Sequence, residues 1–331
     1  MKYAFDEHAV SFTLLLGSSQ ILLLKKVRES LAGRVALYEL WPLLMSELAR
    51  VPDKEEATFP LIGRILSSEN LEATMRDLPQ TLFDDEAERL RSAEAFLLTW
   101  GGMPALLDLS AEERRKWLRD YEYTYLERDL GDLARLDDLG PFRKFQKLAA
   151  LCSARLLNYS ELARDAGVSV DTARRYLEYL RLSYQVILLQ PFARNLTSQV
   201  IKAPKLYWLD VGLMRQLSGI RGEHAGEVYE TMVVSELYKW INTTQHSAEM
   251  FFYRSRSGME VDLMLKTDFG YLAIEIKGRQ RLASKDVRAM KAVANALGDE
   301  WLGGLVVYNG DDVLRVSEPS IWAVPSYRLL T

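Results

Sequence analysis

Residues 258–277 read GMEVDLMLKTDFGYLAIEIK, and this stretch decides the expected fold of the second half of the chain. Two apolar runs, Val261–Leu265 and Tyr271–Ile276, flank a turn that contains Gly270, a pattern typical of a β-hairpin. The runs are apolar at successive positions, so both faces of each strand are expected to be covered. The stretch therefore predicts a hairpin inside a buried sheet.

Charged residues interrupt this apolar hairpin. Asp262 lies within the first run, and Glu275 and Lys277 close the second. Alternate residues of a strand share a face, which puts Glu260 beside Asp262 and Glu275 beside Lys277. An unpaired buried carboxylate costs roughly several kcal/mol, so converging carboxylates need a cation or a proton. The hairpin predicts a point where carboxylates and one lysine meet.

The composition bounds the class of protein. At 331 residues, with 48% hydrophobic and 27% charged residues, the chain is expected to form a soluble globular protein of two or three domains. Cys152 is its single cysteine, which excludes an internal disulfide or a Cys-based zinc site and fits a reducing compartment. The three histidines, His8, His224 and His246, lack metal-ligand spacing. Without a signal-peptide pattern or a run of 18 apolar residues, we expect a cytoplasmic protein with no membrane partner.

Charge is unevenly distributed along the chain, although the formal net charge is only -4. Residues 51–140 hold 21 Asp and Glu against 11 Lys and Arg, whereas residues 141–205 hold 11 Lys and Arg against 4 Asp and Glu. A local net charge of +7 favours a polyanion such as DNA as partner. The alternative is that these bases pack against the acidic neighbouring segment.

The basic segment contains the pattern of a helix-turn-helix in residues 159–182. Ser160 is expected to cap the first helix, Gly167 supplies the turn, and Ser169 is expected to cap the second helix. The second helix is expected to enter a DNA major groove if the segment binds DNA.

Two further apolar runs, Val186–Leu189 and Lys205–Leu209, predict a wing hairpin, so the segment is interpreted as a winged helix. The candidate DNA-binding residues are polar or basic and lie on the second helix or near the wing tip: Thr172, Arg174, Arg175, Arg194, Lys202 and Lys205. The alternative is a winged helix that only packs between its neighbours.

The N-terminal stretch at residues 13–48 reads TLLLGSSQILLLKKVRESLAGRVALYELWPLLMSEL. It resembles the later part of the ATPase domain in prokaryotic AAA-type ATPases that carry a C-terminal domain of unknown function. The resemblance places Ser18 or Ser19, at the end of a strand like sensor 1, near a γ-phosphate, and Arg34 matches the arginine after Ser-Leu-Ala-Gly. The chain contains no G-x-x-x-x-G-K-[ST] phosphate loop. We expect a family member that begins inside its ATPase domain through truncation, decay or a misplaced start, and that does not hydrolyse ATP by itself.

From Gly226 the expected order is helix, three strands, helix and strand, which resembles the restriction-endonuclease-like fold of the P-D-(D/E)-x-K superfamily, particularly its archaeal Holliday-junction-resolvase-like branch. The matching residues are Glu230 in the first helix, Arg256-Ser257-Gly258, Asp262, and Glu275-Ile276-Lys277. Val261 stands where the motif has proline.

This resemblance implies a Mg²⁺ ion held by Asp262, Glu275 and Glu230, with the Ile276 carbonyl as a further ligand. It implies that Lys277 positions or helps to deprotonate the attacking water during DNA phosphodiester hydrolysis. Resolvase-like folds are often dimers, so the resemblance also admits a homodimer. The alternative is a nuclease-like fold that has lost its catalytic activity, in which Lys277 only neutralises Glu275.

Together these patterns predict an α/β multidomain protein. The expected divisions are an AAA-type remnant at residues 1–50, a helical lid and connector at 51–140, a winged helix-turn-helix at 141–212, and a nuclease-like α/β domain at 213–331. Three functions remain open: a metal-dependent DNA nuclease, a non-catalytic DNA-binding or protein-interaction module, and an ATP-binding subunit whose phosphate loop is supplied elsewhere.

Overall fold

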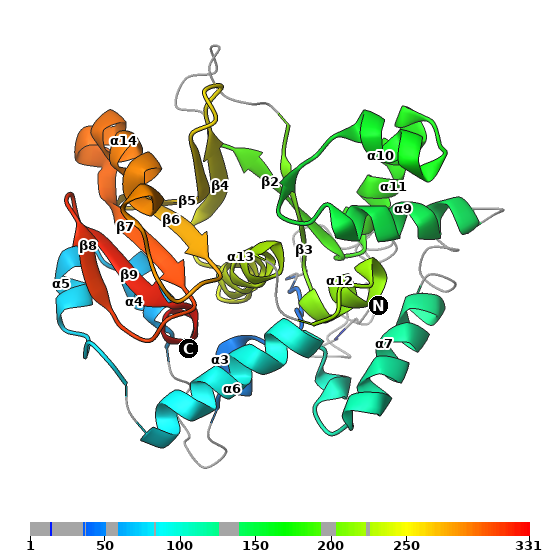
Figure 1. Ribbon diagram of the computed structural model, residues 1–331, viewed down its shortest axis with the longest axis horizontal. Coiled ribbons are helices and arrows are strands. Elements are labelled where there is room, and N and C mark those ends of the chain that lie inside the picture. The colour runs from blue at the N-terminus through cyan, green and yellow to red at the C-terminus, as the bar shows by residue number, and fades with distance from the viewer. Residues whose placement is uncertain are drawn as a thin grey trace, which may run out of the picture.

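The computed structural model describes residues 14, 36, 38–50, 59–82, 84–125, 139–192, 203–222 and 226–331. In these ranges the chain is a mixed α/β protein built around a nine-stranded sheet with the order β1-β3-β2-β4-β5-β6-β7-β9-β8 (Figure 1). The prediction of an α/β fold is confirmed. None of the helices in these ranges is both long and apolar enough to cross a membrane.

The strands are β1 (Arg155–Leu156), β2 (Val186–Pro191), β3 (Lys205–Trp208), β4 (Glu249–Arg254), β5 (Glu260–Thr267), β6 (Gly270–Lys277), β7 (Trp301–Tyr308), β8 (Leu314–Ser317) and β9 (Ile321–Pro325). The α-helices are α3 (Met45–Leu48), α4 (Leu61–Leu66), α5 (Leu71–Arg76), α6 (Asp84–Trp100), α7 (Ala111–Tyr125), α9 (Gly140–Leu151), α10 (Tyr159–Ala166), α11 (Val170–Leu182), α12 (Val211–Ser218), α13 (Gly226–Thr243), α14 (Arg288–Leu297) and α15 (Ser326–Leu329).

The predicted hairpin is confirmed as β5 and β6, which pair antiparallel. Its two faces pack into two different cores: Leu263 belongs to the large core that includes residues of α13, and Met264 belongs to a smaller core that includes Met290 of α14. Gly270 has a φ of 135°, and a Cβ there would lie 2.6 Å from the backbone oxygen of Glu300. The turn therefore requires glycine, and the apolar run is explained by a strand covered on both sides.

The two helices of the basic segment are α10 and α11, joined at Gly167, which is left-handed with a φ of 75°. As predicted, Ser169 caps α11, because its hydroxyl accepts a hydrogen bond from the Thr172 amide at 3.1 Å. The prediction for α10 is wrong: Asn158, and not Ser160, is the cap, since its side chain accepts from the Glu161 amide at 3.2 Å. Ser160 already lies inside the first turn.

The helix-pair region, defined as residues 139–192 and 203–210, continues directly into the C-terminal sheet. Strand β2 pairs antiparallel with β3 on one side and parallel with β4 on the other. The Phe192 amide donates a hydrogen bond to the Phe252 carbonyl at 2.6 Å. Pairing with β4 covers an edge of β2 that would otherwise be open. The segments expected as domains 141–212 and 213–331 therefore share one sheet.

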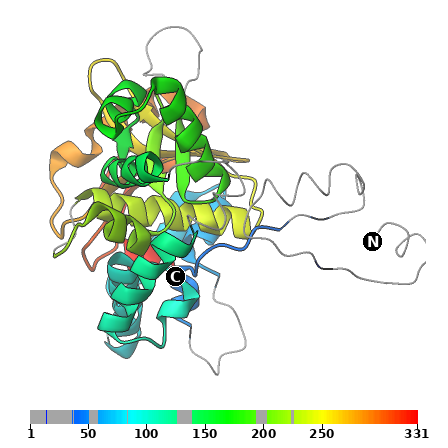
Figure 2. The same ribbon diagram turned by 90° about the vertical axis from the view of Figure 1, so that its right-hand side faces the viewer.

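The helical segments lie around this sheet. Seen from the side, α9, α10 and α11 lie at one end of the molecule and α6 and α7 at the other, with α12 and α13 between them (Figure 2). Asp210 holds two of these parts together, because its buried carboxylate accepts from the amides of Leu213 in α12 and Gly102 after α6, both at 2.8 Å. Helix α13 packs against both β3 and β6.

Candidate active site

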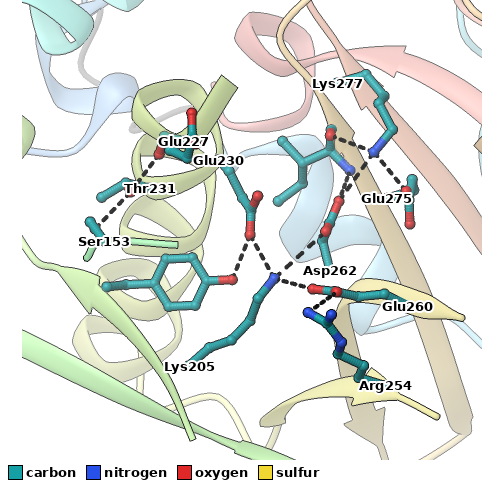
Figure 3. A network of polar contacts seen from close by, with 12 residues as sticks. Ser153, Lys205, Glu227, Glu230, Thr231, Arg254, Glu260, Asp262, Glu275 and Lys277 are labelled. Carbon is teal, nitrogen blue, oxygen red and sulfur yellow. Dashed lines mark hydrogen bonds and ion pairs between the residues drawn. The ribbon is translucent and has the colours of Figure 1, made fainter. Parts of the chain in front are cut away.

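A pocket of about 670 Å³ lies where the helix-pair region meets the C-terminal hairpin. Its walls come from β1, β3, α13, β4, β5 and β6, so it is built by segments far apart in the sequence. Figure 3 shows the polar side chains that face one another there. Five carboxylates line the pocket: Glu227, and a cluster of four formed by Glu230, Glu260, Asp262 and Glu275.

Asp262 lies at the centre of the pocket and is only 7% exposed. Strands β5 and β6 pair in register as far as Leu263 and Ile274. Beyond that point, a backbone amide of β6 can donate a hydrogen bond to a side chain and not to the backbone of β5. The Ile276 amide donates a hydrogen bond to Asp262 Oδ2 at 2.8 Å. This contact fixes the carboxylate against β6.

The Lys277 ammonium gathers three oxygens. Its Nζ lies 2.6 Å from Glu275 Oε1, 3.0 Å from the Ile276 carbonyl and 3.5 Å from Asp262 Oδ2. The second oxygen of Glu275 is buried and has no hydrogen-bond partner among the described residues. The sequence thus correctly places Asp262, Glu275 and Lys277 at one point.

Lys205 is the second cation of the pocket. Its Nζ lies 3.0 Å from Glu230 Oε1, 2.5 Å from Glu260 Oε1 and 3.8 Å from Asp262 Oδ1. The Tyr207 hydroxyl, on the same face of β3, donates to Glu230 Oε1 at 2.7 Å. The expected place for Lys205 was a DNA-contacting wing tip, but the residue is 3% exposed and points into the acidic pocket.

Sequence reasoning missed the part that Lys205 and Glu260 play together in the pocket. One signal for Lys205 existed, because it opens the strand KLYW, in which all four residues are buried. A charge at the start of such a strand needs a partner of opposite sign. Its partners, however, come from α13 and β5, which the sequence does not join to β3.

Arginines line the mouth of the pocket, each beside an acidic residue. Arg254 pairs with Glu260 at 2.9 Å, and its side chain is 36% exposed. Arg155 pairs with Glu227 at 3.1 Å. Arg279 contacts the Asp286 carboxylate at 2.6 Å. These three arginines are the most exposed cations among the residues that line the pocket.

Burial governs the protonation of the carboxylates. Burial and the neighbouring Asp262 raise the pKa of Glu275, and Lys277 opposes this rise. Burial and Asp262 likewise raise the pKa of Glu230, against the effect of Lys205. Burial alone would lower the pKa of Lys277, but Asp262 and Glu275 raise it above the ordinary lysine value. The pocket therefore favours additional positive charge, as a proton or as a metal ion.

The residues present fit a Mg²⁺ ion by donor chemistry, because Asp262 Oδ2, Glu275 Oε1 and the Ile276 carbonyl already converge on one cation, the Lys277 ammonium. In the described part of the chain, no three His, Cys, Asp or Glu side chains are arranged to hold a metal by side chains alone. The carbonyl supplies the third oxygen. Glu230, also expected as a ligand, is held by Lys205 on the other side of Asp262.

The remaining candidate residues lie elsewhere. The three on α11 are not among the described residues that line the pocket. Arg174 lies over the Tyr159 ring at 4.9 Å, Arg175 is exposed, and the Thr172 hydroxyl accepts from Ser169 Oγ at 2.9 Å. The others fall outside the described residues: Ser18, Ser19, Arg34, Arg194 and Lys202.

Three family models match successive parts of the chain. Residues 1–49 match an AAA domain, residues 93–224 match a domain of unknown function (DUF8612), and residues 225–329 match another domain of unknown function (DUF4143). The last match contains Glu230, Asp262, Glu275 and Lys277, whereas Lys205 falls in the preceding one.

Two curated mycobacterial proteins resemble the chain over most of its length. The uncharacterized proteins Mb2031c of Mycobacterium bovis and Rv2008c of Mycobacterium tuberculosis are each 27% identical over 326 residues. The alignments cover 96% of this chain but only 63% of each relative, so the chain spans less than two thirds of their length. No solved structure matches the chain. The three matches therefore run in the order of an AAA domain followed by two domains of unknown function.

Proposed function

We propose that this chain is a DNA-associated protein of the AAA-type family whose C-terminal pocket hydrolyses phosphodiester bonds with the help of Mg²⁺. The observation that carries the proposal is the convergence of Asp262 Oδ2, Glu275 Oε1 and the Ile276 carbonyl on the Lys277 ammonium. Two carboxylates, a carbonyl and a lysine at the end of a buried hairpin are the groups that this chemistry needs.

Each residue of the pocket has a role in this proposal. Asp262 and Glu275 would hold the ion, which supplies polarisation of the phosphoryl oxygen and a lowered pKa for bound water. The Lys277 side chain is 24% exposed, so its ammonium can turn toward the pocket mouth and stabilise negative charge on the phosphate. Arg254 and Arg279 at the rim add an attraction for the DNA backbone.

The helix-pair region would bring DNA to this pocket as a winged helix. In this proposal α11 enters a major groove, and its exposed Arg175 contacts a phosphate or a guanine edge. The proposal is supported by the left-handed turn at Gly167 and the cap at Ser169, which join two short helices through a tight turn. The continuous sheet then fixes this element relative to the pocket.

A second candidate is a non-catalytic DNA-binding protein. The observation that favours it is that the four clustered carboxylates, Glu230, Glu260, Asp262 and Glu275, already contact Lys205, Lys277 or Arg254. Such a neutralised cluster can serve as a structural joint between the helix-pair region and the hairpin. DNA affinity should then fall steeply with salt while cleavage stays absent.

Cleavage assays separate the two candidates. Supercoiled plasmid and branched DNA are incubated with the full chain and Mg²⁺ or Mn²⁺, and with Asp262→Ala. The proposal expects metal-dependent cleavage by wild type that is lost in the variant and in the presence of a chelator. Binding of DNA by wild type without cleavage in either metal would favour the second candidate.

A further inference from the structure

The Asp262 carboxylate lies between two ammonium groups. Its Oδ1 is 3.8 Å from Lys205 Nζ, and its Oδ2 is 3.5 Å from Lys277 Nζ. Each ammonium gathers oxygens from three groups, and Asp262 is the group that they share (Figure 3). The pocket therefore has two separate cation positions, and both are taken by side chains of the chain itself.

The Lys205 position is the more acidic of the two. All three of its oxygens come from carboxylates, those of Glu230, Glu260 and Asp262. With the ammonium in place, these three carboxylates are not spaced to hold a metal ion. Mg²⁺ binds oxygen ligands at about 2.0–2.1 Å, so the carboxylates would have to close on the point where the ammonium now lies. A metal ion and the ammonium cannot occupy this point together.

The side chains of Lys205 and Lys277 differ in how far the protein encloses them. The Lys205 side chain is 4% exposed, and its backbone pairs with Leu156 of β1 and Leu189 of β2. Its ammonium lies over the ring of Phe252, 5.9 Å from the ring centre. Lys277, in contrast, ends its strand with a 24% exposed side chain. The Lys277 side chain therefore has solvent to turn into, whereas the Lys205 side chain is enclosed by the protein.

We infer that Lys205 is a built-in cation that fills the second cation position, so that the pocket takes one divalent ion and not two. Lys205 is then a positioning residue, since it holds Glu230, Glu260 and Asp262 in place without touching the substrate. The inference deepens the proposed function and rests on it. It also gives the helix-pair region a direct part in the site, because Lys205 belongs to β3.

The number of Mn²⁺ ions bound per chain tests this inference. Wild type, Lys205→Met and Lys205→Arg are titrated with Mn²⁺ by calorimetry and by electron paramagnetic resonance, after circular dichroism has shown that each is folded. We expect one ion for wild type and Lys205→Arg, and two for Lys205→Met. Lys239→Met is the matched control, because Lys239 is equally buried, pairs with Glu236 on α13, and lies outside the pocket. It should still bind one ion.

Each outcome decides a claim. Two ions on wild type, or one on both wild type and a folded Lys205→Met, overturn the inference and leave the proposed function intact. No ion on wild type overturns the proposed function; a gain of one ion in Lys205→Met would then still support Lys205 as the occupant of a cation position, and no gain would overturn both. If Lys205→Met does not fold, the stoichiometries of wild type and Lys205→Arg decide: one ion each supports the inference and two overturn it.

Discussion

Gln190 of β2 pairs in parallel with Phe251 of β4, and this pairing joins the helix-pair region to the C-terminal strands. Lys205 reaches the pocket from one side of this seam, and Asp262 reaches it from the other. The geometry of the pocket therefore depends on a contact between segments about sixty residues apart in sequence. A substitution that weakens the β2–β4 pairing should therefore destabilise both the helix-pair region and the C-terminal strands.

Phe252→Ala is expected to loosen both sides of this seam. Phe252 is fully buried, and its removal leaves a cavity that lowers the free energy of unfolding by about 3–5 kcal/mol. Hydrogen exchange followed by mass spectrometry should show faster exchange in β2 and β3 as well as in β4 and β5. Phe269→Ala, at a 46% exposed turn, is the control and should change little. Faster exchange confined to β4 and β5 would contradict the shared sheet.

Arg175→Ala is expected to weaken DNA binding. Arg175 is exposed on α11, and loss of one phosphate contact should make the slope of log affinity against log salt shallower by about 0.9. Arg181→Ala on the same helix is the control, because both oxygens of Glu178 already hold the Arg181 guanidinium. Fluorescence anisotropy with a labelled duplex at several salt concentrations measures both. Equal effects of the two changes would argue against groove binding by the exposed face of α11.

Stability should fall as the pH rises through the range in which Glu94 titrates. Burial raises the pKa of Glu94 from 4.5 to about 7, against the lowering effects of the Ser326 hydroxyl, which donates to its carboxylate, and of Arg91. The folded chain therefore binds the proton more tightly than the unfolded chain does. The free energy of unfolding should fall between about pH 4.5 and pH 7, by on the order of 3 kcal/mol at most.

Urea unfolding at several pH values measures this slope. Glu94→Gln removes one titrating group and should make the dependence shallower over that range, while Glu230 and Glu275, whose pKa values are also raised, continue to contribute to it. Glu88→Gln, an exposed change on the same helix, should leave the slope as it is in wild type. An unchanged slope in Glu94→Gln would show that another group governs the pH dependence.

Local patterns of the sequence predicted the parts of the site that lie on one hairpin. Alternation along two short strands is enough to bring Asp262, Glu275 and Lys277 together, because a hairpin with a glycine turn has few possible registers. Helix α13 could be predicted from its apolar spacing, with Glu230 in its second turn. These inferences need only contacts between neighbouring elements.

The cation from β3 could not be predicted in the same way. Lys205 enters the pocket only because β2 pairs with β4, and no local pattern specifies which edges of two hairpins meet. The prediction of the α10 cap was wrong for a simpler reason, since Asn and Ser are both good N-cap residues, and Asn158 and Ser160 lie two residues apart. Long-range pairing and near-equivalent caps are decided by packing.

The most direct test of the proposed site is a calorimetric Mn²⁺ titration of wild type, Asp262→Asn and Glu249→Gln. The asparagine can still accept the hydrogen bond from the Ile276 amide, so the hairpin should stay folded while the charge is lost. Glu249→Gln is the matched change on β4, where the Glu249 side chain is 57% exposed and pairs with Lys266. We expect wild type and Glu249→Gln to bind alike and Asp262→Asn to bind at least about tenfold more weakly. Equal binding by all three proteins would contradict a metal site at Asp262.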